Sequence, residues 1–151
     1  ATVAIAETSS GGGIAQALLA VRGASSYFRG GVVCYSKDSK LALLGLQPGS
    51  TKPTSTEGHA TELAESVRQK LAADWGIGET GVAGPTPNSH GVAPGVCAVA
   101  VVGPNGFARS ALLSPGEQKG DPAAREENMA TFASAALELL HESLRHQQDT
   151  P

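Results

Sequence analysis

The chain has few aromatic residues, little basic charge and no long apolar run, and each shortage excludes a class of protein. Only 4% of its 151 residues are aromatic, so its core must be built mainly from Ala, Val and Leu. Its 11 Lys and Arg against 14 Asp and Glu give a net charge of −3, which argues against binding to nucleic acid or to a membrane surface. No run approaches the roughly 18 apolar residues of a membrane helix, and no signal peptide is visible.

Cysteine and histidine are also too sparse to indicate a disulfide framework or a metal site. The two cysteines lie in apolar runs, Val33-Cys34-Tyr35 and Val96-Cys97-Ala98, and we expect both to be buried, reduced strand residues. This favours the cytoplasm or another reducing compartment, and an organelle stays open. The four histidines show no ligand spacing, so we expect neither metal nor cofactor. We expect His59 on a helix surface and His90 in a solvated loop.

Alternating apolar runs and helical patterns predict one α/β domain over residues 1–151, with a three-layer α/β/α arrangement and a mixed, mostly parallel sheet. Strands are expected at 2–6, 30–35, before 80–85, at 95–102 and at 107–113, with the last two joined as a hairpin by Asn105-Gly106. Helices are expected at 14–21, with an apolar stripe of Ile14, Leu18 and Val21, at 40–44, from Ser55 or Thr56 to about Asp74, and at the end of the chain. That last helix carries an apolar stripe of Met129, Phe132, Ala136 and Leu139, and we expect the tail at 146–151 to be frayed.

The most informative segment is the turn Glu7-Thr8-Ser9-Ser10-Gly11-Gly12-Gly13, between the first strand and the first helix. Its glycines allow a sharp turn and a close approach to a ligand, and the helix start offers unpaired N–H groups. It matches neither a P-loop nor a dinucleotide-binding fingerprint. Its three adjacent hydroxyls could include a nucleophile, although a glycine turn with a simple Ser/Thr helix cap explains the same residues.

Two further segments could complete a site with this turn. Tyr35-Ser36-Lys37-Asp38-Ser39-Lys40 supplies a tyrosine and lysines, and a lysine whose pKa is lowered by burial can activate a hydroxyl without histidine or metal. A tyrosine at a strand end beside exposed lysines is the plainer interpretation. The second glycine turn, Thr80-Gly81-Val82-Ala83-Gly84-Pro85, also follows a strand, so both turns could face one crevice at the carboxyl ends of the strands.

Four motifs occur in an order and spacing that resemble the C-terminal domain of the competence/damage-inducible protein CinA, the nicotinamide-mononucleotide amidase family. The family pattern has Glu-Ser-x-Thr-Gly-Gly, Pro-Gly-Ser-Ser-x-Tyr-Phe, Gly-Val-Val-x-Tyr-Ser-Asn-x-x-Lys and Thr-Gly-Ile-Ala-Gly-Pro. The chain has Glu7-Thr8-Ser9-Ser10-Gly11-Gly12, Gly23-Ala24-Ser25-Ser26-Tyr27-Phe28, Gly31-Val32-Val33-Cys34-Tyr35-Ser36-Lys37-Asp38-Ser39-Lys40 and Thr80-Gly81-Val82-Ala83-Gly84-Pro85. The resemblance covers nearly the whole chain. The family's leading helix, which precedes the first strand, has no counterpart in this sequence.

The resemblance implies an amidohydrolase that converts the carboxamide of nicotinamide mononucleotide to a carboxylate and releases ammonia. It implies a catalytic hydroxyl at Thr8, activated by Tyr35 and Lys40, and no cofactor. The implied partner is a small-molecule substrate, and a homodimer is permitted. Substrate or oxyanion binding is expected from two glycine turns and one arginine, namely Ser9, Ser10, Gly11, Gly12, Thr80, Gly81, Ala83, Gly84 and Arg125.

The chain departs from the family pattern at three places. Thr8 replaces a serine, and its methyl group restricts the side chain, so Ser9 and Ser10 are nearby alternatives. The loop 86–95 lacks the family's Gly-Gly pair and its lysine. Gly120-Asp121-Pro122 stands where the family has Gly-Asp-Arg, with Arg125 one turn further on. A homologue that binds a nucleotide or another small molecule without turnover is therefore the alternative to an active enzyme.

Overall fold

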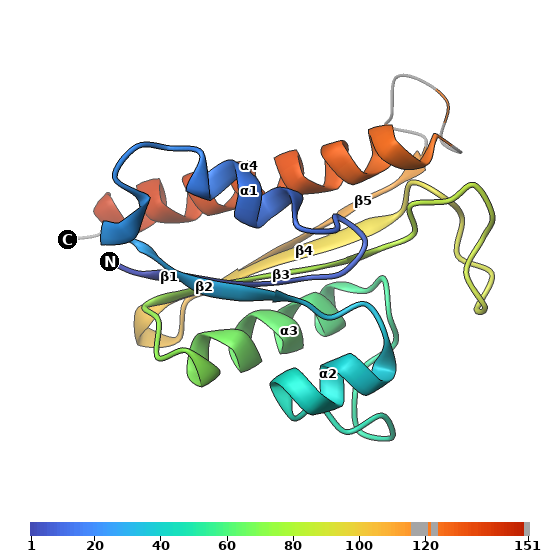
Figure 1. The fold of residues 1–151 in the computed structure, drawn as a ribbon, viewed down its shortest axis with the longest axis horizontal. Coiled ribbons are helices and arrows are strands. Elements are labelled where there is room, and N and C mark those ends of the chain that lie inside the picture. Colours follow the sequence, from blue (N-terminus) through green and yellow to red (C-terminus); the bar gives the residue numbers. More distant parts are fainter. Residues whose placement is uncertain (116–120, 122–123, 150–151) are drawn as a thin grey trace.

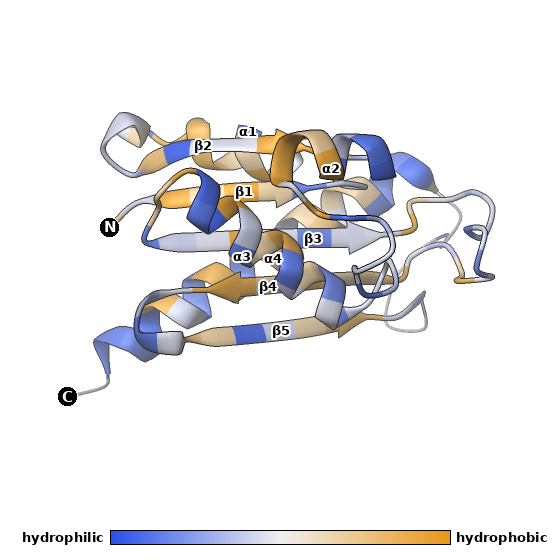
Figure 2. Cartoon of the chain, turned by 90° about the horizontal axis from the view of Figure 1, so that it is seen from below, coloured by the Kyte–Doolittle hydropathy of each residue, from blue (hydrophilic) through white to orange (hydrophobic). Residues whose placement is uncertain are grey.

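Five short strands form one sheet in the computed structural model, which describes residues 1–115, 121 and 124–149. The strand order is β2-β1-β3-β4-β5 (Figure 2). β1 pairs in parallel with β2 and with β3, and β4 is antiparallel to both of its neighbours, so four of the five strands point the same way. The strands are β1 (Val3–Glu7), β2 (Phe28–Val33), β3 (Trp75–Gly81), β4 (Cys97–Val102) and β5 (Ala108–Leu113).

Helices cover both faces of this sheet (Figure 1). α1 (Gly13–Leu19) and α4 (Arg125–Gln148) lie on one face, and α2 (Lys37–Leu44) and α3 (Glu57–Lys70) on the other. Two short 3₁₀ turns, η1 (Ala24–Ser26) and η2 (Pro104–Gly106), connect elements. The expected three-layer α/β/α domain with a mixed, mostly parallel sheet is confirmed.

Side chains of each strand alternate between the two faces of the sheet. Val3 and Ile5 of β1 pack in the core that contains Phe132 of α4. Ala4 and Ala6 pack on the opposite side, in the core that contains Leu63 of α3. A strand buried on both faces therefore leads directly into the serine-rich turn.

Glycines of β3 let α3 lie unusually close to the sheet. A Cβ at Gly78 would stand 2.0 Å from the carbonyl oxygen of Ala60, and one at Gly76 would stand 2.2 Å from that of Ala64. No side chain fits at either position. The N-terminal end of α3 lies below the end of β3 that leads into the second glycine turn (Figure 1), and Ser55 N, just before α3, donates to Thr80 Oγ1 of β3.

Several boundaries differ from the sequence expectation. α1 ends at Leu19, so Val21 lies outside it and is 57% exposed rather than part of its apolar stripe. α3 begins after the Thr56 cap, as expected, but ends at Lys70 rather than near Asp74. The β4–β5 hairpin and the buried stripe of α4 are confirmed. α4 continues through His146 to Gln148, so the expected frayed tail is wrong for 146–148, whereas 150–151 lie outside the described residues.

The helices described here are too short or too polar to cross a membrane.

Candidate active site

A cavity of about 190 Å³ lies where β1 and β3 end, between the two glycine turns. Ser9 of the first turn, Tyr35 after β2 and Arg125 at the start of α4 face it from three parts of the chain. The second turn and the loop after it supply the rest of the lining, Gly81, Val82, Ala83, Gly84, Thr86, Pro87 and Asn88. The expectation that both glycine turns share one crevice is confirmed.

Arg125 joins two walls of this cavity. Its Nη1 donates to the carbonyl oxygen of Gly84, and its Nη2 lies 3.4 Å from the hydroxyl of Tyr35. One turn along α4, Asn128 Nδ2 donates to the carbonyl oxygen of Ala83 at 2.9 Å. The N-terminal end of α4 is thus fixed to the second glycine turn, and the Tyr35 side chain, 65% exposed, remains accessible at the rim.

The serine-rich turn is held from inside by the buried carboxylate of Glu79 on β3. Its Oε1 accepts hydrogen bonds from Thr8 N at 3.0 Å, Ser10 N at 2.9 Å and Ser10 Oγ at 2.6 Å. Its Oε2 accepts from Ser9 Oγ and, at 3.7 Å, from Cys97 Sγ. A charged acceptor satisfies several donors in a small volume, which fixes the backbone of the turn.

A second buried carboxylate, that of Glu7, occupies the beginning of α1. Its oxygens accept from Ile14 N at 3.2 Å and Ala15 N at 3.1 Å, and from Ser10 Oγ at 2.5 Å. Negative charge is favourable at a helix start, and here the chain's own side chain supplies it. Gly11 N donates to the carbonyl oxygen of Thr8, so two of the N–H groups expected to bind an oxyanion, those of Ser10 and Gly11, are already paired within the protein.

On the opposite face of the sheet lies a buried chain of polar groups that contains Lys40. Its Nζ is 3.0 Å from His59 Nε2, and His59 Nδ1 is 3.1 Å from Glu62 Oε2. The expectation of His59 on the helix surface is wrong: it is 1% exposed, because α3 turns this side towards α2 and the sheet. The carboxylate on Nδ1 implies the tautomer in which Nε2 accepts from the Lys40 amine.

Burial dominates the electrostatics of this chain of groups. It lowers the pKa of Lys40, an effect to which the charge of Lys37 adds and which the negative charge of Glu79 opposes. Burial also lowers the pKa of His59, against the stabilising hydrogen bond from Glu62. The direction of the Lys40 pKa shift favours the neutral amine.

The structure divides the predicted site residues into two groups. Ser9, Tyr35, Gly81, Ala83, Gly84 and Arg125 line the cavity. Thr8, Lys40 and Thr80 do not. Thr8 is buried and its backbone N–H donates to Glu79 Oε1, and Thr80 Oγ1 accepts from Ser55 N at 3.1 Å. Ser10, Gly11 and Gly12 form the turn behind Ser9, and Gly120 and Pro122 lie outside the described residues.

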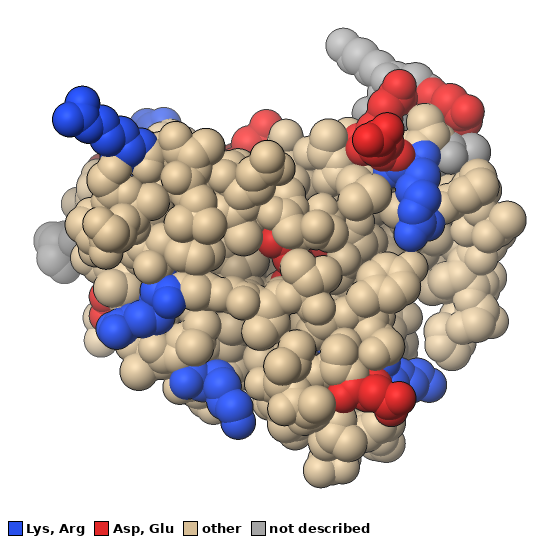
Figure 3. All heavy atoms as spheres, in the orientation of Figure 1, with Lys and Arg blue, Asp and Glu red and all other residues tan. Residues whose placement is uncertain are grey.

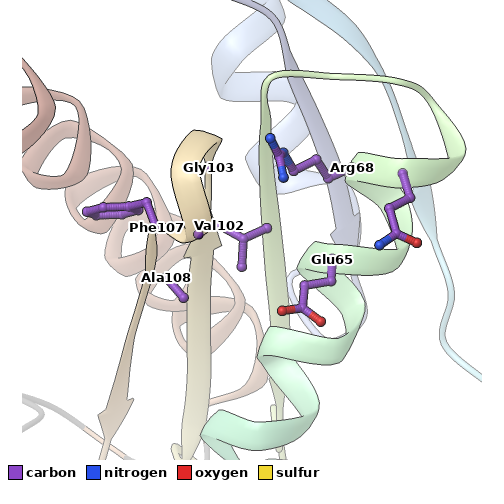
Figure 4. A pocket seen from close by; sticks show the side chains of 8 residues that line it. Glu65, Arg68, Val102, Gly103, Phe107 and Ala108 are labelled. Atoms are coloured by element: carbon purple, nitrogen blue, oxygen red, sulfur yellow. The ribbon is translucent and has the colours of Figure 1, made fainter.

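A second hollow, of about 230 Å³, opens at the other end of the sheet (Figure 4). Glu65 and Arg68 of α3 project towards it, and Val102, Gly103, Phe107 and Ala108 form its opposite side. None of the predicted site residues reaches it, and it lies beyond the amino ends of β1 and β3. The cavity beside Ser9 is therefore the candidate active site.

Two buried charged or polar residues of the site were missed from the sequence. Glu79 is a carboxylate inside an otherwise apolar and glycine-rich strand, Trp75–Gly81, and this isolated charge is the signal that could have marked it. His59 has no comparable signal, because helical spacing alone places it equally well on the exposed side of α3. Among the described residues, no three His, Cys, Asp or Glu side chains are grouped as they are around a metal ion.

The chain is similar to known proteins over most of its length. The CinA C-terminal domain family model matches residues 1–144. A CinA-like protein of Gloeobacter violaceus is 38% identical over 145 residues, 95% of this chain and 33% of that protein, and one of Prochlorococcus marinus is 44% identical over 110 residues, 70% and 25%. The chain spans about a third or less of the length of these relatives.

Solved structures share the fold. The competence damage-inducible protein A of Klebsiella pneumoniae superposes with a TM-score of 0.83 at 25% identity, over 96% of this chain and 87% of that chain. The competence/damage inducible protein CihA of Agrobacterium tumefaciens gives a TM-score of 0.77 at 27% identity, over 94% and 84%.

Proposed function

The chain belongs to the CinA C-terminal domain family, and on this premise we propose that it is a metal-independent amidohydrolase acting on nicotinamide mononucleotide or a related small amide. The reaction converts the substrate carboxamide to a carboxylate and releases ammonia. The family includes nicotinamide-nucleotide amidases, and three of the four motifs that carry the resemblance, those containing Ser9, Tyr35 and Gly81, contribute to one cavity in this chain.

The single observation that carries the proposal is the composition of that cavity. A turn hydroxyl, a tyrosine hydroxyl and a guanidinium group, from Ser9, Tyr35 and Arg125, converge on about 190 Å³ at the carboxyl ends of the central strands. Sites of α/β sheets form at this edge, and these groups supply a nucleophile, a hydrogen-bond donor and a cation for an anionic substrate group.

The resemblance assigns the reacting hydroxyl to Thr8, with Tyr35 and Lys40 as its activating pair. The lowered pKa of Lys40 supports a role as a base. Arg125 takes the place of the family's arginine before the last helix and binds the substrate phosphate. Arg125 is suited to this role because it lines the cavity and already lies 3.4 Å from the Tyr35 hydroxyl.

A binding module without turnover is the second candidate function, and one observation favours it. Neither Thr8 nor Lys40 lines the cavity, and the Lys40 amine lies 3.0 Å from His59 Nε2. Ammonia release from nicotinamide mononucleotide decides between the two functions. An enzyme releases one ammonia for each molecule of acid formed. For a binding module, the nucleotide raises the melting temperature of the protein and no ammonia is released.

We also propose that the chain forms a homodimer through the face seen in Figure 3. That face, over α1, β2 and α2, carries few charged groups near its centre. Large apolar side chains are exposed on these elements and on the segments that follow them, namely Leu19, Val21, Val33, Tyr35, Leu41 and Leu43. Light scattering tests the proposal: a dimer mass that falls to a monomer mass in Val33→Asp supports it, and a monomer mass for the unaltered chain refutes it.

A further inference from the structure

We propose that Ser9, with Glu79 as the acceptor of its proton, is the hydroxyl that attacks the substrate carboxamide, in place of Thr8. This inference rests on the proposed function and specifies which groups perform it. It assigns a catalytic role to Glu79, for which the family resemblance gives none.

The three hydroxyls of the turn stand in different surroundings. Ser9 lines the cavity, whereas Thr8 and Ser10 do not. Ser10 Oγ lies 2.5 Å from Glu7 Oε1 and 2.6 Å from Glu79 Oε1, so two carboxylates hold it in the interior. Thr8 binds Glu79 through its backbone N–H, and Thr8 is not among the residues that line the cavity. Only Ser9 combines a hydroxyl at the cavity with a direct carboxylate partner.

The two oxygens of Glu79 have separate partners, which suits a base. Oε1 receives the Thr8 and Ser10 N–H groups and the Ser10 hydroxyl, and so anchors the turn. Oε2 receives the Ser9 hydroxyl and the weak Cys97 thiol donor. A carboxylate held rigidly by one oxygen keeps the other at a fixed place beside the nucleophile, which is the geometry that general-base catalysis needs.

Gly81 of the second turn keeps the Ser9 hydroxyl unobstructed. A Cβ at Gly81 would stand 2.9 Å from Ser9 Oγ and 3.0 Å from the Cβ of Cys97. Any side chain there would press on the hydroxyl, on the side where the cavity opens. The glycine of the Thr80-Gly81-Val82-Ala83-Gly84-Pro85 turn thus has a direct role in giving Ser9 room.

The reaction balances with water as its only other reactant. Ser9 Oγ bonds to the carboxamide carbon while its proton passes to Glu79 Oε2, and the Tyr35 hydroxyl donates a hydrogen bond to the oxyanion. The C–N bond breaks, and ammonia leaves with the proton from Glu79. Water then attacks the Ser9 ester and gives a proton to Glu79. The C–O bond to Ser9 breaks, and Ser9 Oγ takes that proton back.

Acylation by p-nitrophenyl acetate tests the assignment independently of the natural substrate. The protein is quenched in acid, digested, and the acetylated residue is located by fragmentation in the mass spectrometer. The proposal expects acetyl on Ser9, its loss in Ser9→Ala, and its strong reduction in Glu79→Gln. Acetyl on Thr8 or Ser10, or no acetyl on the turn, overturns the proposal.

Kinetics on nicotinamide mononucleotide separate this inference from the proposed function. Ser9→Ala is expected to lower kcat by roughly 10³-fold or more, Thr8→Val by less than about tenfold. Ser134→Ala, at an exposed serine of α4, is the matched control and leaves kcat unchanged. A large loss in Thr8→Val with activity kept in Ser9→Ala overturns the inference alone. Acetylation of Ser9 without ammonia release overturns the nucleotide substrate and leaves Ser9 as the nucleophile.

Discussion

Lys40 Nζ lies 3.0 Å from His59 Nε2 beneath the sheet, and both groups are buried. His59 in turn reaches Glu62, which is only partly buried, so the chain of polar groups runs from the interior towards solvent. The lysine that the family resemblance marks as a base thus has a histidine as its nearest polar partner. The dependence of the unfolding free energy on pH should therefore reflect the burial of Lys40 and His59.

Acid destabilisation is the first prediction. Burial holds the pKa of folded His59 below its ordinary 6.5, so below about pH 6.5 the unfolded chain takes up the proton first and stability is lost as pH falls. One such group contributes a slope of at most about 1.4 kcal/mol per pH unit. His59→Gln should flatten the dependence of unfolding free energy on pH between 4 and 7. His90→Gln, at an exposed histidine, should leave this pH dependence unchanged. Equal slopes of unfolding free energy against pH in the unaltered chain, His59→Gln and His90→Gln would refute the burial of His59.

The two thiols should not react in the folded protein. Burial raises the pKa of Cys34 to about 11, and burial with the nearby Glu79 charge raises that of Cys97 well above its ordinary value. A thiol reacts as its thiolate, so Ellman's reagent at pH 8 should detect almost no thiol in the folded protein. After guanidinium unfolds the chain, it should detect two thiols per chain. Rapid reaction without denaturant would contradict the burial of Cys34, just after β2, or of Cys97, at the start of β4.

Substitution at Gly81 should damage activity beyond its effect on folding. Gly81→Ala places a methyl group 2.9 Å from Ser9 Oγ, and overpacking of this kind costs about 1–3 kcal/mol. We expect kcat to fall by at least tenfold in protein that still unfolds cooperatively. Gly49→Ala is the matched control, because no atom lies within 4 Å of the added Cβ. Equal activity in the two variants would show that the Ser9 hydroxyl needs no such room.

Arg125 should determine the affinity for the phosphate. Loss of a charged hydrogen-bond donor costs about 1.5–3 kcal/mol, so Arg125→Met should raise KM for nicotinamide mononucleotide roughly 10–100-fold. KM for nicotinamide riboside, which has no phosphate, should rise much less. Arg22→Met, at an exposed arginine, serves as the control for loss of one positive charge. A uniform rise for both substrates would place Arg125 at another part of the substrate.

The sequence was sufficient for the fold because local patterns and global architecture agree. Apolar runs bounded by glycine gave the strands, Thr56 capped α3, and the Asn105-Gly106 pair joined β4 to β5. The boundaries were less predictable: α1 ends at Leu19, and Val21, which the apolar spacing placed in its stripe, lies outside it and is exposed.

The site was predictable in its segments but not in its side-chain pairing. Motif order brought Ser9, Tyr35 and Arg125 to one cavity, as expected from strands that end at one sheet edge. It did not show that Glu79 would reach into the serine turn or that His59 would face Lys40. Both contacts join residues that are separated in the chain, 19 positions for Lys40 and His59 and about 70 for Glu79 and the serine turn.

Ammonia and acid formed from nicotinamide mononucleotide, measured together in the same samples, test the central claim most directly. The account predicts equal amounts of ammonia and nicotinate mononucleotide from the unaltered chain and from Ser134→Ala, and almost none from Ser9→Ala. Thermal stabilisation by the nucleotide with no ammonia from any of the three proteins would contradict it and leave a binding module in its place.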